Sequence, residues 1–220
     1  MNNILFIDFD STFAKIETID EIAKISLKND PNQERKIQLI KRITNSAMSG
    51  EISFSKALQD RLNILNLNSQ HIELVINEVS NNISKSIIRN KKTIQSIANN
   101  IWIISGGFTQ IICPIVKEYG IEPERVIANT FLFDSNKVKG IDLNNPMSMD
   151  QGKIKAINNL NISLKTIMIG DGYTDYEVYD KQASDYFIYY SENIFRSKIA
   201  SKSEFIANSF EDVLNIISKF

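Results

Sequence analysis

The chain changes between two hydrophobic patterns, and each change marks a change of structure. Residues 4–7 are four apolar residues in a row, which fits a buried strand. From residue 16 to residue 83, apolar side chains instead recur every three or four positions, which predicts amphipathic helices. Pro31, Gly50 and the polar stretch 66–69 divide this region into four segments. The pattern therefore predicts one strand followed by a small four-helix unit without strands.

Strand patterns return in the rest of the chain. Residues 101–104 and 166–169 are apolar runs that end in Ser105-Gly106-Gly107 and Gly170-Asp171-Gly172. We expect a helix to open at the first of these loops and to end near Gly120. A hairpin should cover residues 129–141, a helix should begin near Asp150, and a strand should cover residues 186–190. Strands that alternate with helices predict an α/β fold with a Rossmann-like parallel sheet.

The domain organisation follows from where the helical segments interrupt the α/β pattern. We assign residues 1–13 and 86–220 to an α/β core and residues 14–85 to an inserted small four-helix domain. Ligands of parallel sheets bind outside the carboxyl ends of the strands. The insertion follows the first strand directly, so we expect it to stand over that crevice.

Composition excludes several classes of function. The chain has 25 Lys and Arg against 26 Asp and Glu, so it carries no basic surplus for a nucleic acid. Its single cysteine excludes an intrachain disulfide and a cysteine metal cage. No apolar run approaches the ~18 residues of a membrane span, and no signal segment precedes the first strand. We expect a cytoplasmic protein without nucleic-acid or membrane partners; the sequence does not give its oligomeric state.

The first candidate site is the pair of aspartates at the tip of the first strand. In extended backbone Asp8 and Asp10 face the same way, and two close carboxylates repel each other. A divalent cation between them is the simplest remedy. One aspartate would then act as a metal-bound nucleophile and the other, Asp10, as an acid and base whose pKa the neighbouring carboxylates would raise. The alternative is a loop start with two capping aspartates.

A second acidic loop, Gly170 to Asp175, follows another buried strand. Mg²⁺ prefers octahedral oxygen coordination. Asp8 and Asp171 would supply carboxylates to it, and the backbone carbonyl of Asp10 would supply a third oxygen. Asp175 would act from behind these ligands, orienting a metal-bound water or Lys153. The alternative for this segment is an ordinary Gly-Asp-Gly turn.

Other residues suit a phosphate group and a zwitterionic substrate. Ser105 and Gly106 would offer a hydroxyl and backbone N–H groups to an anion, and Lys153 would neutralise a phosphate oxygen. Arg61 lies on an apolar helix stripe, so it either extends to solvent or binds a substrate carboxylate. Glu17 would take an ammonium group. N-capping and solvation are the alternatives for Ser105 and Lys153.

These motifs, in this order, resemble the haloacid dehalogenase superfamily of aspartate-nucleophile phosphotransferases. The resemblance covers nearly the whole chain, and the helical insertion resembles the superfamily's C1-type cap. Within the superfamily, residues 10–23 and 48–62 resemble phosphoserine phosphatases. The resemblance implies that Asp8, Asp10 and Lys153 are catalytic and that Mg²⁺ is the cofactor. It also implies that Glu17, Met48, Phe54 and Arg61 contact the amine, apolar edge and carboxylate of a phosphoserine substrate.

The chain departs from the family at two positions of the second acidic loop. Thr174 stands where many members carry asparagine, which puts a phosphate or water contact there in doubt. Tyr173 replaces a smaller residue, so we expect it to narrow the pocket. Neither change removes a charge that the chemistry needs.

The sequence therefore predicts a Mg²⁺-dependent phosphomonoester hydrolase that acts through an aspartyl-phosphate, with O-phosphoserine as substrate. Three alternatives remain open. The substrate could be another small phosphomonoester, such as a phosphorylated sugar, amino alcohol or methylthio metabolite. The chain could be a non-hydrolytic phospho-acceptor domain, as in signalling receivers, or a binding protein with an inactive site. The acid and base in reach of one pocket argue for phosphoserine.

Overall fold

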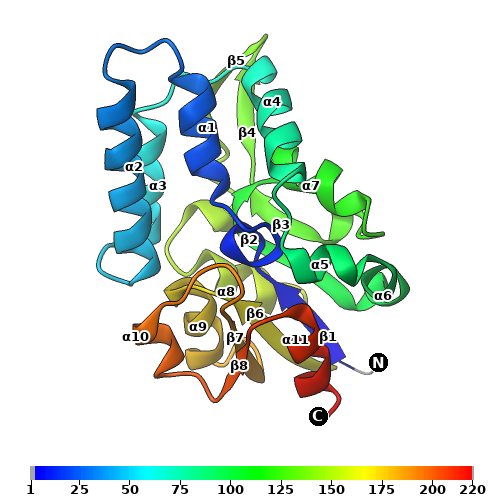
Figure 1. Ribbon diagram of the computed structural model, residues 1–220. Helices are drawn as coiled ribbons and strands as arrows, with labels where there is room; N and C mark the ends of the chain where they lie inside the picture. Colours follow the sequence, from blue (N-terminus) through cyan, green and yellow to red (C-terminus); the bar gives the residue numbers. More distant parts are fainter. Residues whose placement is uncertain (1–2, 220) are drawn as a thin grey trace.

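The computed structural model describes residues 3–219, and its centre is a parallel sheet (Figure 1). Six strands lie in the order β3-β2-β1-β6-β7-β8, each parallel to its neighbours. This confirms the predicted α/β fold class. The strands are β1 (Asn3–Ile7), β2 (Ile101–Phe108), β3 (Val126–Asn129), β6 (Lys165–Gly170), β7 (Tyr186–Tyr190) and β8 (Phe205–Ala207).

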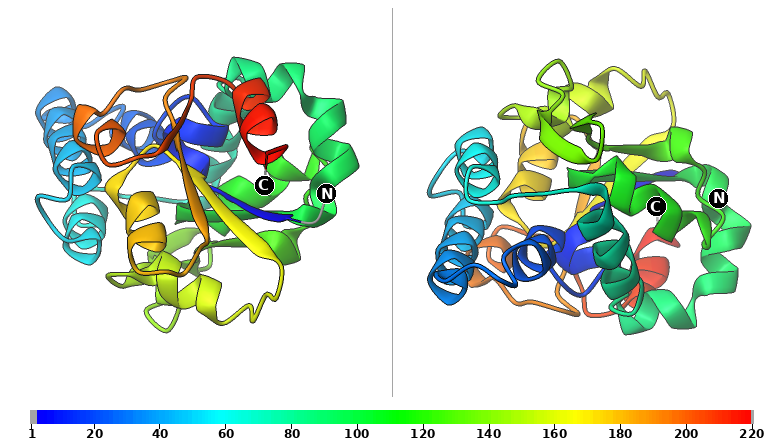
Figure 2. Two further views of the ribbon diagram at one scale, coloured as in Figure 1. Left: turned by 90° about the horizontal axis from the view of Figure 1, so that it is seen from below. Right: turned by 90° about the horizontal axis from the view of Figure 1, so that it is seen from above.

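Helices cover both faces of this sheet (Figure 2). Because side chains alternate along a strand, Leu5 and Ile7 of β1 join one apolar cluster and Ile4 and Phe6 join another. The first cluster includes residues of α5 (Lys85–Arg89), α6 (Lys91–Ile97), α7 (Thr109–Lys117) and α11 (Phe210–Ile217). The second includes residues of α8 (Gly152–Asn158), α9 (Tyr173–Asp180) and α10 (Ser197–Ala200). The two-layer covering explains why the central strands are apolar on both faces.

The predicted helical unit is present between β1 and β2. It consists of α1 (Thr18–Ser26), α2 (Gln33–Met48), α3 (Phe54–Leu62) and α4 (Ser69–Ser80). The predicted hairpin is formed by β4 (Phe131–Asp134) and β5 (Lys137–Ile141), and it lies beside the start of α4 (Figure 1). The apolar side chains of the unit, such as Ile22 and Val75, are continuous with the cluster on the α7 face of the sheet. The division into two domains stays a prediction.

One predicted boundary is wrong. The helix expected to open at Ser105-Gly106-Gly107 begins at Thr109, because β2 continues through the two glycines to Phe108. The register between β2 and β3 shifts between Ile104 and Phe108. Glycine in a strand often accompanies such an irregularity. Ser105 therefore lies in the second half of strand β2 rather than at the start of a helix.

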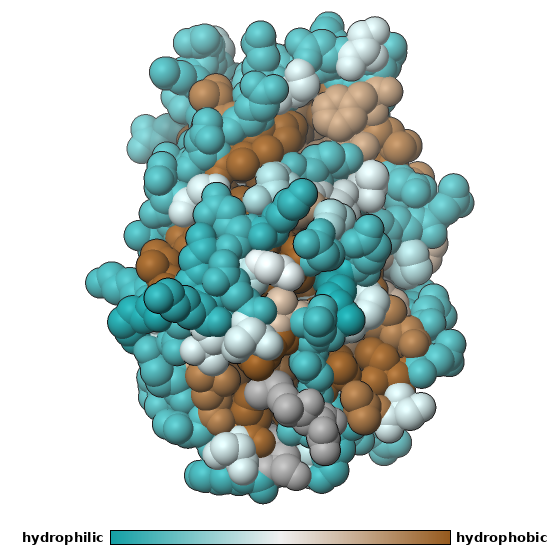
Figure 3. All heavy atoms as spheres, turned by 90° about the vertical axis from the view of Figure 1, so that its right-hand side faces the viewer, coloured by the Kyte–Doolittle hydropathy of each residue, from teal (hydrophilic) through white to brown (hydrophobic). Residues whose placement is uncertain are grey.

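Within residues 3–219, every helix is too short or too polar to cross a bilayer. Seen from the side of α6 and α7, hydrophilic side chains cover most of the face, and apolar ones gather in several separate areas (Figure 3).

Candidate active site

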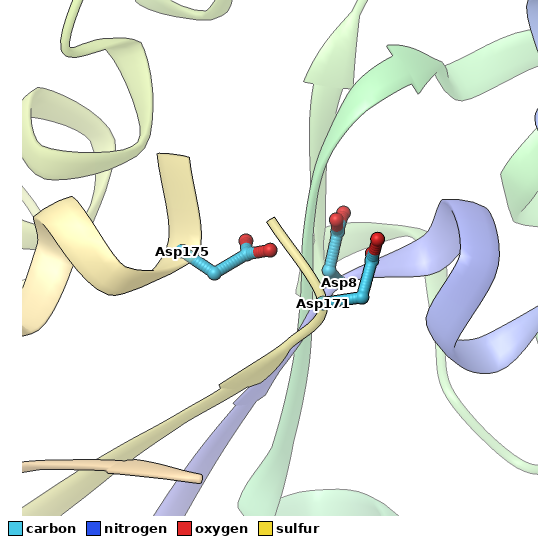
Figure 4. Close-up of side chains that lie close together, drawn as sticks. All are labelled: Asp8, Asp171 and Asp175. Carbon is cyan, nitrogen blue, oxygen red and sulfur yellow. The ribbon is translucent and has the colours of Figure 1, made fainter. Parts of the chain in front are cut away.

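The two acidic loops meet at the point where the strand order reverses. Strands β1 and β6 are neighbours in the sheet, although 157 residues separate Ile7 from Lys165. The chain leaves β1 toward β2 on one side and leaves β6 toward β7 on the other. Asp8 follows β1 and Asp171 follows β6, so both lie in the crevice at the carboxyl ends. Figure 4 shows their carboxylates pointing the same way, while Asp175 points toward them from α9.

A buried lysine joins two of these carboxylates. The Lys153 Nζ lies 2.9 Å from Asp8 Oδ1 and 2.6 Å from Asp175 Oδ1. The other oxygen of Asp175 accepts a hydrogen bond from the Gly172 backbone N–H at 3.0 Å. Both carboxylate oxygens of Asp175 therefore have a partner, and Asp175 holds the Lys153 ammonium group next to Asp8. Burial lowers the pKa of Lys153, but the charges of Asp175 and Asp8 outweigh it, so the net pKa is raised and the ammonium stays charged.

The carboxyl groups of this cluster resist ionisation. Burial raises the pKa of Asp8 well above its ordinary value, and Asp175 and Asp171 add to the effect while Lys153 opposes it. Burial also raises the pKa of Asp171 to about 7, against the charge of Arg196. The lysine and arginine thus leave the negative charge of the cluster only partly compensated.

Asp10 has a raised pKa as well, but the cause differs from the one expected. We expected neighbouring carboxylates to raise it. Burial instead raises the pKa of Asp10 to about 6, while hydrogen bonds from Thr18 and the charges of Arg61 and Lys153 lower it. The Thr18 backbone N–H donates to Asp10 Oδ1 at 2.8 Å, and the Thr18 hydroxyl donates to the same oxygen. Thr18 therefore fixes the direction of this carboxyl group from the start of α1.

The donor set fits a hard divalent cation. Oxygens of Asp8, Asp171 and Asp175 lie within 4.8 Å of one another, and all three residues are buried. An all-oxygen set in a buried pocket is what Mg²⁺ prefers, and a cation would relieve the uncompensated charge. The Asp10 carboxylate stands apart from this group of three.

A pocket opens above the carboxylates, between the sheet and the helical unit. Of the predicted site residues, it is lined by Asp8, Asp10, Glu17, Met48, Phe54, Arg61, Gly106, Lys153 and Thr174. Asp171 and Asp175 lie beneath it, fully buried. Ser105 is also buried, and its Oγ accepts the Gly107 backbone N–H at 2.9 Å. The fold thus brings residues from both acidic loops and from the helical unit to one cavity.

Arg61 points into this pocket rather than to solvent. It is 4 % exposed, its Nε donates to the Ala57 carbonyl at 3.0 Å, and its Nη1 donates to Thr44 Oγ1 at 3.1 Å. A guanidinium has five N–H donors, so donors remain for a ligand. Burial lowers the pKa of Arg61, and Glu17 and Asp10 oppose that shift. The arginine enters the pocket from α3 with its position already fixed.

Glu17 is the acidic counterpart of Arg61 in the pocket. Its Oε1 accepts a hydrogen bond from the Ser11 hydroxyl at 2.7 Å. Burial raises the pKa of Glu17 to about 7, and the negative charge of Asp10 adds to the effect. This pocket therefore offers both a cation and a titratable carboxyl group to a ligand.

Side chains of the helical unit contact two glycines at the carboxyl ends of the strands, one within β2 and one just after β6. A Cβ on Gly106 would lie 2.7 Å from the Phe54 ring, and one on Gly172 would lie 2.9 Å from the Met48 sulfur. The Ser55 backbone N–H also donates to Asp150 Oδ1 at 2.8 Å. Only glycine permits so close an approach, so the two apolar side chains close the pocket against the strand ends. Tyr173 lies over Gly50 instead of narrowing the pocket.

One charged residue of the site was missed from sequence. Arg196 follows β7, and its Nε donates to Asp171 Oδ2 at 3.0 Å while its Nη2 lies 4.0 Å from Glu17 Oε1. It thus joins the metal-binding candidate to the pocket carboxylate. The strand over residues 186–190 was predicted, but no motif after it marks the arginine. Only the path of the chain beyond β7 brings it to the acidic loops.

Comparison with known proteins agrees with this geometry. A family model described as haloacid dehalogenase-like hydrolase matches residues 5–179. A phosphoserine phosphatase of Drosophila melanogaster is 33% identical over 219 residues, which cover 97% of this chain and 77% of the fly protein. The matched segment includes both acidic loops.

Solved structures give the same result. A phosphoserine phosphohydrolase-like protein from Francisella tularensis superposes with a TM-score of 0.87 at 33% identity, covering 99% of this chain and 100% of the other. A phospho-aspartyl intermediate analogue of phosphoserine phosphatase superposes with a TM-score of 0.77 at 23% identity and covers 98% of each chain. At that identity the second match bears on the fold alone.

Proposed function

The chain belongs to the haloacid dehalogenase-like hydrolase family and is a phosphoserine phosphatase-like phosphoric monoester hydrolase, and we propose that its substrate is O-phosphoserine. The observation that carries the proposal is the pocket itself. Glu17 and Arg61 both line the cavity that holds Asp8 and Lys153. Among phosphomonoesters, a ligand with an ammonium and a carboxylate group uses both charges. The named relatives, including the fly enzyme, support the same substrate.

The charged ends of the substrate have matching partners. The free N–H donors of Arg61 would hold the carboxylate bidentately, and the Glu17 carboxylate would accept the ammonium group. Phe54 and Met48 would cover the apolar edge. The phosphate would then face Asp8, with Lys153, the Gly106 backbone N–H and Thr174 at its oxygens. Ser105 would support this loop from below, because its Oγ binds the Gly107 N–H.

Asp8 would attack the phosphorus, forming an aspartyl-phosphate and breaking the bond to the serine oxygen. Lys153 directs the Asp8 carboxylate and stabilises charge on the transferred group. Asp10, whose pKa is raised to about 6, would donate its proton to the leaving oxygen. Water would then attack the aspartyl-phosphate and pass a proton back to Asp10. Closure of the helical unit over the pocket would exclude other water during the first step.

We propose Mg²⁺ as the cofactor. The carboxylates of Asp8 and Asp171 and the backbone carbonyl of Asp10 would hold it, with Asp175 and Lys153 behind them. The ion would screen the repulsion between the Asp8 carboxylate and the phosphate, in addition to the charge that Lys153 supplies.

A substrate panel tests the proposed function. The panel compares kcat/KM for O-phospho-L-serine and its D enantiomer with those for two truncated analogues and an aryl phosphate. Phosphoethanolamine lacks the carboxylate, and phosphoglycolate lacks the ammonium. Each missing charge should lower kcat/KM about 10- to 100-fold, since a hydrogen bond to a charged group contributes ~1.5–3 kcal/mol. Equal values across the panel would contradict the proposal.

Replacing Arg61 should separate recognition from chemistry. We expect Arg61→Ala to raise KM for phosphoserine about 10- to 100-fold, because the carboxylate loses its guanidinium partner, and the other buried cation that lines the pocket, Lys153, is paired with Asp8 and Asp175. KM for p-nitrophenyl phosphate, which has no carboxylate, should change by no more than about twofold. The control is Arg42→Ala on α2. Equal effects of Arg61→Ala on both substrates would remove Arg61 from recognition.

Substrate binding should depend on pH through Glu17. With its pKa raised to about 7, Glu17 is neutral below that pH and cannot pair with an ammonium group. The ratio of KM for phosphoserine to KM for phosphoglycolate should therefore rise as pH falls below 7, approaching about tenfold per pH unit. Titration of Asp10 or Asp171 affects both substrates and cancels in the ratio. Glu17→Gln should abolish the pH dependence; a slope that persists in that variant would exclude Glu17 as its source.

A further inference from the structure

The chain crosses between the sheet and the helical unit twice, and the two crossings lie side by side. We call residues 13–17 and 81–85 the two linkers. The Lys15 backbone N–H donates to the Asn82 carbonyl at 2.9 Å, and the Ser84 backbone N–H donates to the Phe13 carbonyl at 3.0 Å. Ala14 and Ile83 form an antiparallel bridge between these bonds. The linkers therefore act as one short ribbon at the base of the helical unit.

A side chain from the far end of the chain joins this ribbon to the first acidic loop. Asn193 follows β7, and its Nδ2 donates to the Ser84 Oγ at 2.7 Å and to the Ser11 carbonyl at 3.0 Å. The Ser84 hydroxyl in turn donates to the Thr12 carbonyl at 2.6 Å. An amide NH₂ has two hydrogens to donate, and these two acceptors share them with the Thr12 carbonyl, which lies 3.4 Å from the same nitrogen. One side chain thus holds the second linker and the turn before the first.

The Ser11 turn needs such support. Ser11 has φ +53°, a left-handed conformation that is uncommon for a residue other than glycine, and it is buried. Such a conformation persists only where its surroundings hold it in place. A buried carbonyl also needs a hydrogen-bond donor, and Asn193 donates to the carbonyl of Ser11.

The turn carries a direct consequence for the pocket. The Ser11 hydroxyl donates to Glu17 Oε1 at 2.7 Å, so the conformation of Ser11 sets where that carboxylate points. A chain of hydrogen bonds runs from Asn193 through Ser11 to Glu17. Asn193 does not line the pocket, so it acts on a ligand through the residues that it holds, and of these Ser11 is the one that contacts Glu17.

We propose that Asn193 is a positioning residue for substrate recognition: it holds the left-handed Ser11 turn and the second linker, and thereby aims Glu17 at the ammonium group of the substrate. The role rests on the function proposed above. This role is specific to Asn193 and does not extend to the other residues of the loop after β7. Ser191, two residues earlier, binds Asn208 Oδ1 at 2.8 Å and the Ala207 carbonyl at 3.2 Å, and it makes no hydrogen bond to either linker.

The experiment compares KM for O-phospho-L-serine with KM for p-nitrophenyl phosphate, which has no ammonium group. In Asn193→Ala the ratio of the two KM values should rise about tenfold, as for the loss of one hydrogen bond to a charged group. The matched control Ser191→Ala should leave the ratio within about twofold of wild type. An unchanged ratio in Asn193→Ala, or an equal rise in Ser191→Ala, overturns the proposal. If the alanine variant does not fold, Asn193→Ser decides by the same comparison.

A double-mutant cycle tests the route through Ser11. Ser11→Ala should raise the same ratio, and the double variant should raise it no further than the larger single effect. Effects that multiply would overturn the route. Failure of this proposal can be told apart from failure of the proposed function. If the proposed function were wrong, the wild-type protein itself would not favour phosphoserine over its analogues.

Discussion

Replacing Asp8 by asparagine should abolish turnover without unfolding the protein. Asparagine keeps an oxygen that accepts the Phe9 backbone N–H, which Asp8 Oδ1 accepts at 2.7 Å. It lacks the nucleophilic carboxylate, so kcat should fall by at least about 10⁴-fold. Because burial raises the pKa of Asp8 well above its ordinary value, the charged form is costly in the fold. The melting temperature of Asp8→Asn should therefore equal or exceed that of the wild type.

The measurement is phosphate release together with thermal unfolding. Asp134→Asn is the matched control, because Asp134 lies on the hairpin and pairs only with exposed Lys139 among the described ion pairs. That control should retain wild-type kcat. Activity of Asp8→Asn within about tenfold of wild type would exclude Asp8 as the nucleophile.

Removing Lys153 should damage both stability and activity. Lys153 is 6 % exposed and lies between Asp8 and Asp175. Lys153→Met leaves two buried carboxylates without their partner, and breaking a buried ion pair costs about 3–5 kcal/mol. We expect the free energy of unfolding to fall by that amount and kcat to fall by about 10³-fold, since a cation at the transferred phosphoryl group is lost.

Lys155→Met provides the control on the same helix. Lys155 is exposed and lies two residues along α8, so its replacement should change the free energy of unfolding by no more than about 0.5 kcal/mol. Chemical denaturation of both variants measures the difference. The Asp8→Asn, Lys153→Met double variant should recover part of the lost stability, because one unpaired charge is gone. Equal stability of the two lysine variants would contradict the buried-pair assignment.

Strand ends explain how much of the site was predictable from sequence. The runs before Asp8 and Asp171 are apolar on both faces, which only a central parallel strand requires, and the following carboxylates must then meet at one edge. The strand over residues 186–190 was predicted with the bounds it has. The pocket positions of Glu17 and Arg61 follow from helix periodicity and the resemblance together.

Features that depend on tertiary contacts were not predictable. Strand β8 has three residues, too few for any periodicity to show, and β2 extends through two glycines that usually end a strand. Arg196 and Asn193 reach the acidic loops because of the path that the chain takes after β7, and no local sequence pattern predicts that path. The pKa of Asp10 is raised by burial, and the extent of burial depends on how the helical unit packs over the loop.

The most direct test is phosphate release from O-phospho-L-serine by the wild-type protein and by Asp8→Asn, each with Mg²⁺ and with a chelator. We predict steady release only from the wild type with Mg²⁺, and kcat/KM higher for this substrate than for phosphoethanolamine or phosphoglycolate. Release that persists in the chelator or in Asp8→Asn, or none from the wild type, would contradict an aspartate nucleophile acting beside a divalent ion on phosphoserine.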